Sequence, residues 1–173
     1  MNVLAEFKRV TTFIFDIDGV LTDSTVLVLE NGLQARRMNI KDGLGLQMAI
    51  KNGFRVIAVS GSYSEPVMQR LKKLGLDEVQ MSVTDKKSFV GNYISKNNLT
   101  WEEVLYMADD LPDMALMMMV GLPCCPADAV PEILEISKYI SPVRGGLGCV
   151  RDVIEKVLRV QDKWIFSEDV VSK

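Results

Sequence analysis

The 173-residue sequence contains no histidine. Catalysis that needs an imidazole base, and zinc sites that need imidazole ligands, are therefore excluded. Cysteine is scarce as well: Cys124, Cys125 and Cys149 are the only three, and an odd number with two adjacent members does not suit a disulfide framework. We interpret them as buried, unreactive thiols of a protein that resides in the reducing cytoplasm.

Long apolar runs and dense basic runs are also missing. No apolar segment is long enough to span a bilayer, and residues 1–15 lack the pattern of a secretory signal. A net charge of −3 without a cluster of Lys and Arg argues against a nucleic-acid surface. Without repeats or linker-like tracts, we expect one domain over residues 1–173, with neither nucleic acid nor membrane as a partner.

Segments with strand and helix patterns alternate along the chain. Predicted strands cover residues 11–15, 55–60, 78–81, 104–108, 122–125 and 139–140. Predicted helices cover residues 44–51, 65–74, 86–96, a segment from Pro112 to before Gly121, a segment from an Asp128 cap to Ser137, and residues 150–160. This alternation predicts an α/β fold with a doubly wound, mostly parallel sheet, in which ligands bind beyond the carboxyl ends of the strands.

A β-hairpin is predicted within residues 24–40. Thr25–Leu29 and Leu33–Met38 flank Asn31-Gly32, a dipeptide that supplies the positive φ angles of a tight turn. Residues 26–29 are apolar on both faces, as expected if one face meets another subunit. Burial inside a single subunit is the alternative.

Chemically capable residues stand at the carboxyl ends of these predicted strands, or just beyond them. They are Asp16 and Asp18 after the first strand, Ser60 and Gly61 after the second, Lys86 at the start of the helix after the third, and Asp109, Asp110 and Asp113 after the fourth. Taken singly, each has an ordinary explanation as a turn, a helix cap or a solvated loop. Because the strand ends share one edge of the sheet, we expect the whole set to converge there.

The chemistry that this set suits is phosphoryl transfer. Asp16 is ionised at neutral pH without an activating base, so it can attack phosphorus and form an aspartyl-phosphate. Asp18 can protonate the leaving alkoxide and later accept a proton from water. Mg²⁺ held by Asp16, the Asp18 carbonyl and Asp109 would neutralise charge. Ser60 and the Gly61 amide could bond the phosphate oxygens, and Lys86 adds a fixed positive charge.

Four short motifs resemble those of a known family. FDIDGVLTD (residues 15–23), VSG (59–61), DKK (85–87) and ADDLPD (108–113) resemble the four signature motifs of the haloacid dehalogenase (HAD) superfamily, in the family's order. The resemblance implies a nucleophile at Asp16, an acid/base at Asp18, a phosphate ligand at Ser60, a charge-stabilising Lys86 and a metal ligand at Asp109. It also implies that Asp110 and Asp113 support the metal.

Further motifs resemble one branch of that superfamily, over about residues 8–160. NIKDG (39–43), GLPCCPADAVPE and GGLGCVRD are similar to the phosphatases of 3-deoxy-D-manno-octulosonate 8-phosphate (KDO 8-phosphate), which release a precursor for lipopolysaccharide synthesis. The branch implies a homotetramer joined through the hairpins. It also implies substrate contacts by Asn39, Lys41, Asp42, Gly43 and Arg70. By composition alone, residues 39–42 could be only a turn and a helix cap.

Spacing and substitutions refine this expectation. Too few residues separate Asp16 from Ser60, and Lys86 from Asp109, for a cap domain. Ser62 stands where family members usually carry arginine, and Leu147 replaces an arginine of the glycine-rich tail motif. Loss of a guanidinium affects the recognition of an anionic sugar acid. A nine-carbon substrate of the sialic-acid type therefore remains an alternative. Arg144 and Arg151 are candidates to compensate, with simple solvation as the alternative.

Two other classes of function remain as alternatives. A receiver domain also forms a magnesium-bound aspartyl-phosphate, but it places its acidic pair at the first strand and its acceptor aspartate later, which is the reverse of the order here. A non-catalytic relative should lack a catalytic group, and none is missing. Met114 and Met117–Met119 are expected in a core or a subunit contact. The tail at 161–173 is expected to be disordered or to dock its aromatic residues on a neighbour.

Overall fold

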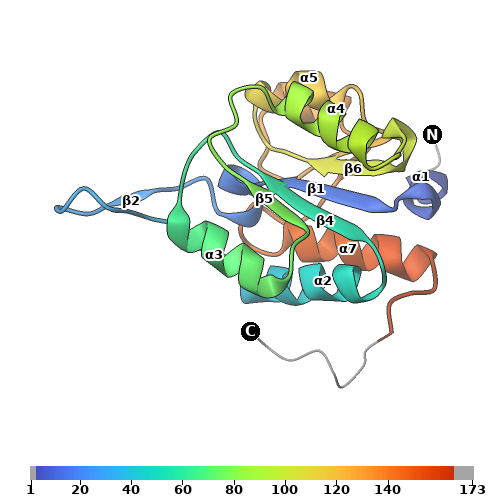
Figure 1. Ribbon diagram of the computed structural model, residues 1–173, viewed down its shortest axis with the longest axis horizontal. Coiled ribbons are helices and arrows are strands. Elements are labelled where there is room, and N and C mark those ends of the chain that lie inside the picture. Colours follow the sequence, from blue (N-terminus) through green and yellow to red (C-terminus); the bar gives the residue numbers. More distant parts are fainter. Residues whose placement is uncertain (1–2, 166–173) are drawn as a thin grey trace.

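The computed structural model describes residues 3–165, in which a six-stranded parallel sheet lies between two layers of helices (Figure 1). The strand order is β5-β4-β1-β6-β7-β8, and every adjacent pair is parallel. The strands are β1 (Thr12–Asp16), β4 (Arg55–Val59), β5 (Glu78–Gln80), β6 (Val104–Met107), β7 (Leu122–Cys125) and β8 (Tyr139–Ile140). The predicted doubly wound α/β fold is therefore confirmed.

Alternate residues of the strands supply the two hydrophobic cores. Phe13 and Phe15 face a core that includes side chains of α2, α3 and α7, whereas Ile14 faces a core with α4, α5 and α6. This division follows from the two-residue period of a strand, which sends successive side chains to opposite faces. The helices are α1 (Val3–Arg9), α2 (Ile40–Lys51), α3 (Glu65–Leu74), α4 (Lys86–Lys96), α5 (Met114–Met117), α6 (Pro131–Ile136) and α7 (Cys149–Val160). No helix among residues 3–165 has both the length and the apolar character needed to cross a bilayer.

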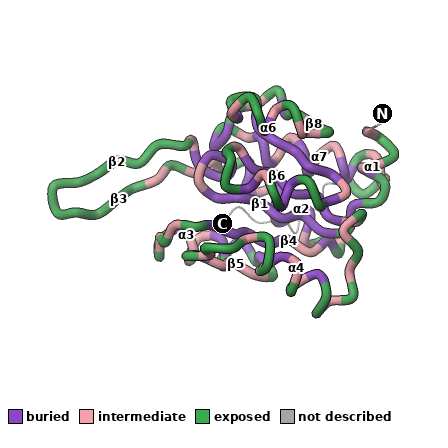
Figure 2. The backbone as a smooth tube through the Cα atoms, turned by 90° about the horizontal axis from the view of Figure 1, so that it is seen from above, coloured by how far each residue is buried: buried purple, intermediate pink, exposed green. Residues whose placement is uncertain are grey.

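The hairpin formed by β2 (Leu27–Val28) and β3 (Gln34–Ala35) projects from the body (Figures 1 and 2). Its turn differs from the prediction. Leu29 and Leu33 flank a three-residue loop, because the Leu29 N–H donates to the Leu33 carbonyl over 2.9 Å. Gly32 has a φ of 81°, but Asn31 does not have a positive φ. A three-residue loop of this kind needs only one left-handed residue, at its last position.

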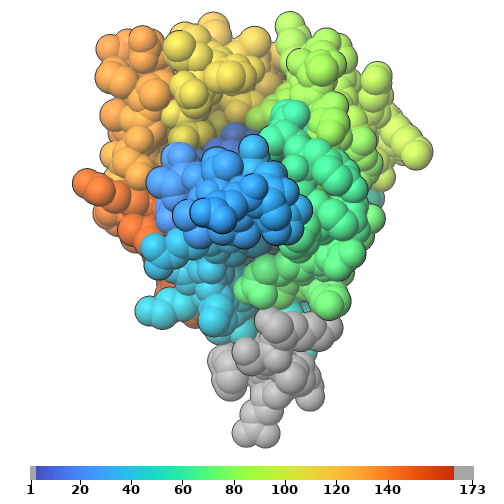
Figure 3. Space-filling view, turned by 90° about the vertical axis from the view of Figure 1, so that its left-hand side faces the viewer, coloured from blue at the N-terminus to red at the C-terminus, as the bar shows by residue number. Residues whose placement is uncertain are grey.

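Apolar side chains of the hairpin are open to solvent. Leu27, Val28 and Leu33 are 64%, 67% and 63% exposed. In Figure 3 the hairpin, in blue, points at the viewer in front of the domain. Burial of this strand inside its own subunit is thus wrong for the chain alone, and the prediction that the hairpin joins subunits stays a prediction.

Several local predictions need correction. The helix from Pro112 is shorter than expected: a 3-10 turn (Leu111–Asp113) precedes α5, which has four residues. Asp128 does not cap α6, since its carboxylate accepts the N–H of Gly145 over 2.9 Å. Helix α1 and the five-residue turn η1 (Ile17–Leu21) have no counterpart in the predicted elements.

The sulfur-containing residues partly follow the predictions. The three cysteines are buried and unpaired within the described chain, and burial raises the pKa of each thiol, as expected for unreactive residues. Met117 is buried, but Met118 is 70% exposed, so the methionine cluster is only partly in the core. In the predicted tail, Trp164 lies under the Arg151 guanidinium, 4.4 Å from its ring centroid, and residues 166–173 lie outside the described part.

Candidate active site

The carboxyl ends of β1, β4 and β6 open onto a pocket of about 590 Å³. These strands are neighbours in the sheet, with β1 between the other two, so the residues that follow them meet at one edge. All predicted catalytic and metal-site residues line this pocket: Asp16, Asp18, Ser60, Lys86, Asp109, Asp110 and Asp113, together with Gly61. The expected convergence is confirmed as geometry.

Lys86 joins the carboxylates of Asp16 and Asp113. As the first residue of α4, it places Nζ 2.8 Å from Asp16 Oδ1 and 2.9 Å from Asp113 Oδ2. Asp113 is held from behind by the hydroxyl of Tyr106, which is fully buried on β6 and donates over 2.7 Å. Burial lowers the pKa of Lys86, but the two carboxylates outweigh this, and the net shift is upward. Lys86 is therefore a fixed cation.

Burial disfavours the charged form of two carboxylates in the pocket. Burial raises the pKa of Asp16 to about 7, although Lys86 opposes the shift, so the expected full ionisation at neutral pH is not reached in the chain without a bound cation. Burial also raises the pKa of Asp109 to about 6, and its hydrogen bond from Ser24, 3.1 Å long, offsets this only in part. Within residues 3–165 no three Asp, Glu, Cys or His side chains form a complete metal site. The donor set of two carboxylates and a backbone carbonyl still fits Mg²⁺, which binds few protein oxygens and keeps waters.

Gly19 lets the first loop approach Asp109. It has a φ of 90°, and a Cβ built there would lie under 3.0 Å from the Asp109 carboxyl. The turn η1 thus brings the backbone after Asp18 directly against Asp109. This close approach is what the predicted metal site requires, since the Asp18 carbonyl and the Asp109 carboxylate must share one ion.

Gly19→Ala should disrupt this arrangement. We expect a loss of about 2–4 kcal/mol in the free energy of unfolding, because a left-handed φ and a steric clash act together. Gly32→Ala is the matched control, since Gly32 has a φ of 81° with no atom near its built Cβ, and it should cost only about 1 kcal/mol. Urea unfolding of both variants measures the difference; equal losses would contradict the close approach.

Asp18 has two partners that the sequence did not reveal. Arg36 Nε lies 2.6 Å from Asp18 Oδ1, and its side chain is only 6% exposed. The Ser62 hydroxyl donates to Asp18 Oδ2. Ser60 is 2% exposed, and its Oγ lies 3.0 Å from Ser62 Oγ. In the sequence, the only indication of the Arg36 contact is a basic residue near apolar residues of the hairpin. The adjacent Arg37 has the same feature, so the sequence does not distinguish the two.

The predicted compensating arginines do not reach the pocket. Arg151 Nε pairs with Glu155 over 3.1 Å, and Arg144 is exposed; neither lines the pocket. The guanidinium near Ser62 belongs instead to Arg36, whose Nη2 lies 3.4 Å from Ser62 Oγ. At the position where the branch usually carries arginine, the nearby guanidinium therefore comes from the hairpin.

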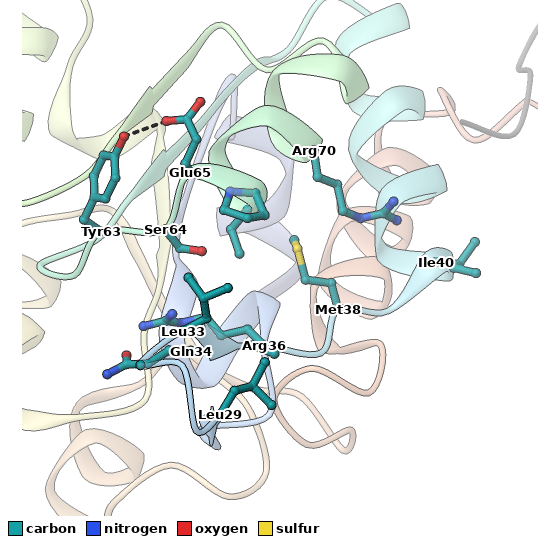
Figure 4. Close-up of a pocket in the computed structure, with 14 residues that line it drawn as sticks. Leu29, Leu33, Gln34, Arg36, Met38, Ile40, Tyr63, Ser64, Glu65 and Arg70 are labelled. Carbon is teal, nitrogen blue, oxygen red and sulfur yellow. Dashed lines mark hydrogen bonds between the residues drawn. The ribbon is translucent and has the colours of Figure 1, made fainter.

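The predicted substrate contacts divide into two groups. Arg70 lines a groove of about 800 Å³ between the hairpin and the start of α3 (Figure 4). Asn39 caps α2 by accepting the Lys41 N–H over 2.8 Å, and Lys41 is exposed; neither lines the groove or the pocket. For these two residues, the alternative of a turn and a cap describes what the chain itself shows.

Asp42 and Gly43 are buried between helices of the chain. Asp42 is 2% exposed, and its Oδ1 accepts the N–H of Arg151, in the first turn of α7, over 2.6 Å. Gly43 is buried where α2 meets α3, so that a Cβ there would lie 3.3 Å from Leu74. Both positions lie in helix packing within the chain itself, and their predicted substrate contacts stay predictions.

Asp42 should make stability depend on pH. Burial raises its pKa from 3.8 to about 6, so the folded state binds this proton more tightly than the unfolded chain. The resulting stability is present below pH 4, is lost as pH rises to about 6, and amounts to at most about 3 kcal/mol. Asp42→Asn keeps the acceptor for Arg151 and removes the titration. Urea unfolding from pH 4 to pH 7.5 should show the variant gaining on the wild type as pH rises; parallel curves would contradict this.

Comparisons with known proteins agree with this geometry. The KDO 8-phosphate phosphatase KdsC of Escherichia coli (strain K12) is 30% identical over 162 residues, which cover 94% of this chain and 86% of that protein. The crystal structure of the Yersinia pestis KDO 8-phosphate phosphatase matches with a TM-score of 0.90 at 29% identity, covering 93% of this chain and 87% of that one.

A second crystal structure holds ligands. The Moraxella catarrhalis KDO 8-phosphate phosphatase, in complex with a magnesium ion, a phosphate ion and a KDO molecule, matches with a TM-score of 0.91 at 27% identity, covering 94% of this chain and 93% of that one. No family model matches the chain. The identity and coverage of the curated relative, together with the shared fold, place this chain in the KDO 8-phosphate phosphatase family of the HAD superfamily.

Proposed function

We propose that this phosphoric monoester hydrolase converts KDO 8-phosphate to KDO and phosphate through an aspartyl-phosphate on Asp16. The observation that carries the proposal is the pocket in which Lys86 bridges Asp16 and Asp113 beside Asp109 and Ser60. The relatives named above act on KDO 8-phosphate, and this chain aligns with them over nearly its whole length. The set of side chains suits displacement at phosphorus.

Asp16 is the proposed nucleophile, and its two oxygens have different surroundings. Oδ1 accepts the Ile17 N–H over 2.7 Å and the Lys86 ammonium over 2.8 Å. We therefore assign the attack to Oδ2. A bond forms between Oδ2 and phosphorus while the bond from phosphorus to the ester oxygen breaks. Lys86 holds the carboxylate in place and offsets the negative charge that gathers on the phosphoryl oxygens.

Asp18 moves the protons of both steps. In its protonated form, Asp18 donates a proton to the leaving alkoxide oxygen in the first step and becomes a carboxylate. In the second step that carboxylate takes a proton from the water that attacks the phospho-aspartate, which restores the protonated form. The second attack breaks the bond between Asp16 and phosphorus and releases inorganic phosphate. Ser60 lies at the same sheet edge, where its hydroxyl can bond a phosphoryl oxygen.

Mg²⁺ is the proposed cofactor, held by Asp16, the Asp18 carbonyl and Asp109. When bound, it supplies the positive charge that allows a carboxylate and a phosphate dianion to approach each other. Burial raises the pKa of Asp16 and of Asp109, and this supports the assignment, because a bound cation would offset the cost of burying the two carboxylates.

Assembly through the hairpin and a place in the cytoplasm are part of the proposal. The exposed apolar residues on β2 and beside it support a contact between subunits, and we propose a homotetramer. The buried thiols support a reducing compartment, where the product would serve lipopolysaccharide synthesis. Sedimentation equilibrium tests the assembly: Leu27→Ser with Val28→Ser should shift the mass to that of a smaller species.

A substrate panel tests the proposed activity. Purified protein with Mg²⁺ is given KDO 8-phosphate, a nine-carbon keto-sugar-acid 9-phosphate and a neutral sugar phosphate, and released phosphate is measured. We expect the highest kcat/KM for KDO 8-phosphate and no release with a chelator. Preference for the nine-carbon ester would instead support the nine-carbon alternative, which remains because Ser62 stands where relatives usually carry arginine. Slow turnover with accumulated phospho-aspartate would favour a receiver-like role, and no turnover a binding role.

A further inference from the structure

Arg36 occupies a position between two cavities. It lines the groove between the hairpin and α3, and it contacts Asp18 and Ser62, which line the pocket with Asp16. Figure 4 shows Arg36 reaching from the hairpin below the start of α3, with Arg70 on the opposite side of the groove toward α2. Arg36 therefore contacts Asp18, the residue proposed to protonate the leaving oxygen of a phosphate ester attacked by Asp16.

The geometry of Arg36 is that of a carboxylate receptor. Its guanidinium already holds one carboxylate oxygen, that of Asp18, 2.6 Å from Nε. Nη2 lies 3.4 Å from Ser62 Oγ. A guanidinium has five N–H donors in one plane, so these two contacts leave donors for a further acceptor. The side chain is 6% exposed, and ion pairs of a desolvated guanidinium are stronger than those of a surface lysine.

We propose that Arg36 is the specificity-determining residue that pairs with the carboxylate of the sugar-acid substrate, from the hairpin side of the pocket. The inference deepens the proposed function and rests on it. It accounts for Ser62: a short hydroxyl at this position leaves room for the Arg36 guanidinium and contacts it. Arg36 thus supplies the cation that is missing directly after VSG (59–61), where related phosphatases usually carry arginine.

The test compares two substrates that differ by one charge. KDO 8-phosphate and its methyl ester have the same phosphate and the same carbon chain, but only the first has a free carboxylate. Wild-type protein should prefer the free acid by about 10- to 100-fold in kcat/KM, the usual discrimination from one charge-assisted pair. Arg36→Met should reduce this preference to less than about threefold, mainly through a higher KM for the free acid.

The ratio of the two substrates separates recognition from structure. Arg36→Met also removes the partner of Asp18, so kcat can fall for both substrates, but an effect on Asp18 alone leaves the preference unchanged. Arg37→Met is the matched control, since Arg37 is the next residue of the hairpin, is exposed and lines neither cavity. It should keep the wild-type preference.

The outcomes distinguish this inference from the proposed function. If Arg36→Met hydrolyses both esters with the wild-type preference, Arg36 does not read the carboxylate, and the proposed function still stands. If wild-type protein hydrolyses neither KDO 8-phosphate nor its methyl ester but does release phosphate from other esters, the proposed substrate is wrong. Loss of the preference in the Arg37→Met variant as well would show that the hairpin acts as a whole, and would overturn the assignment to Arg36.

Discussion

Asp16→Asn should lower kcat by at least about 10⁴-fold, because an amide oxygen is a poor nucleophile toward phosphorus. The fold should persist. Asn can still accept the hydrogen bonds that Ile17 and Lys86 now donate to Oδ1, and the substitution removes a carboxylate that burial already disfavours. The thermal midpoint of the variant should therefore equal or exceed that of the wild type.

The measurement combines turnover with trapping of the intermediate. Wild-type protein quenched in acid during turnover should yield a phosphorylated peptide that contains Asp16, and the variant should yield none. Asp162→Asn is a suitable control, because Asp162 is exposed and has a φ of 56°, a conformation that asparagine tolerates. If the Asp16→Asn variant turned over substrate at more than about 1% of the wild-type rate, another residue would have to be the nucleophile.

Lys86→Met should affect both stability and activity. Lys86, Asp16 and Asp113 have side chains that are 11%, 10% and 2% exposed, so removal of the ammonium leaves two buried carboxylates without their cationic partner. The free energy of unfolding should fall by about 3 kcal/mol, a typical cost when one partner of a buried ion pair is removed. Turnover should fall by about 10²- to 10³-fold, as when a fixed electrostatic donor is lost.

The free energy of unfolding is measured by urea unfolding in the presence of a chelator, because a divalent cation could take the place of the lost ammonium. Lys87→Met is the matched control: Lys87 is the adjacent residue of α4 and is exposed, so its loss should change either quantity little. If both variants unfold at the same urea concentration, the bridge between Asp16 and Asp113 does not contribute to stability.

The sequence predicted those features that depend on short segments. The bounds of α3 and α4 match the predicted residues 65–74 and 86–96, because Gly75 ends α3 with a φ of 95° and Asp85 caps α4. The catalytic set was predictable for a similar reason. The aspartates and Ser60 follow strands with a clear apolar pattern, and parallel strands bring such residues to one edge.

Features that depend on distant pairs were not predictable. The contact of Arg36 with Asp18 depends on how the hairpin leaves the body, which no local pattern specifies. Asp42 lies within a motif that resembles a substrate loop, but a residue 109 positions later on α7 determines its role. The predicted turn type at Asn31-Gly32 was wrong for a similar reason. The same Asn-Gly pair suits two loop lengths, and the strand register decides between them.

The chain of contacts from Tyr106 through Asp113 and Lys86 to Asp16 has an evolutionary consequence. Tyr106 is fully buried among residues of α4, α5 and α6, so the resting position of the nucleophile is anchored in the interior of that layer. Repacking of those helices by neutral drift would displace the reactive carboxylate even though no residue at the pocket mouth had changed. On the hairpin, Arg36 contacts Asp18, but the exposed residues Leu27, Val28 and Leu33 have no such link, so they can change while the phosphoryl-transfer machinery stays fixed.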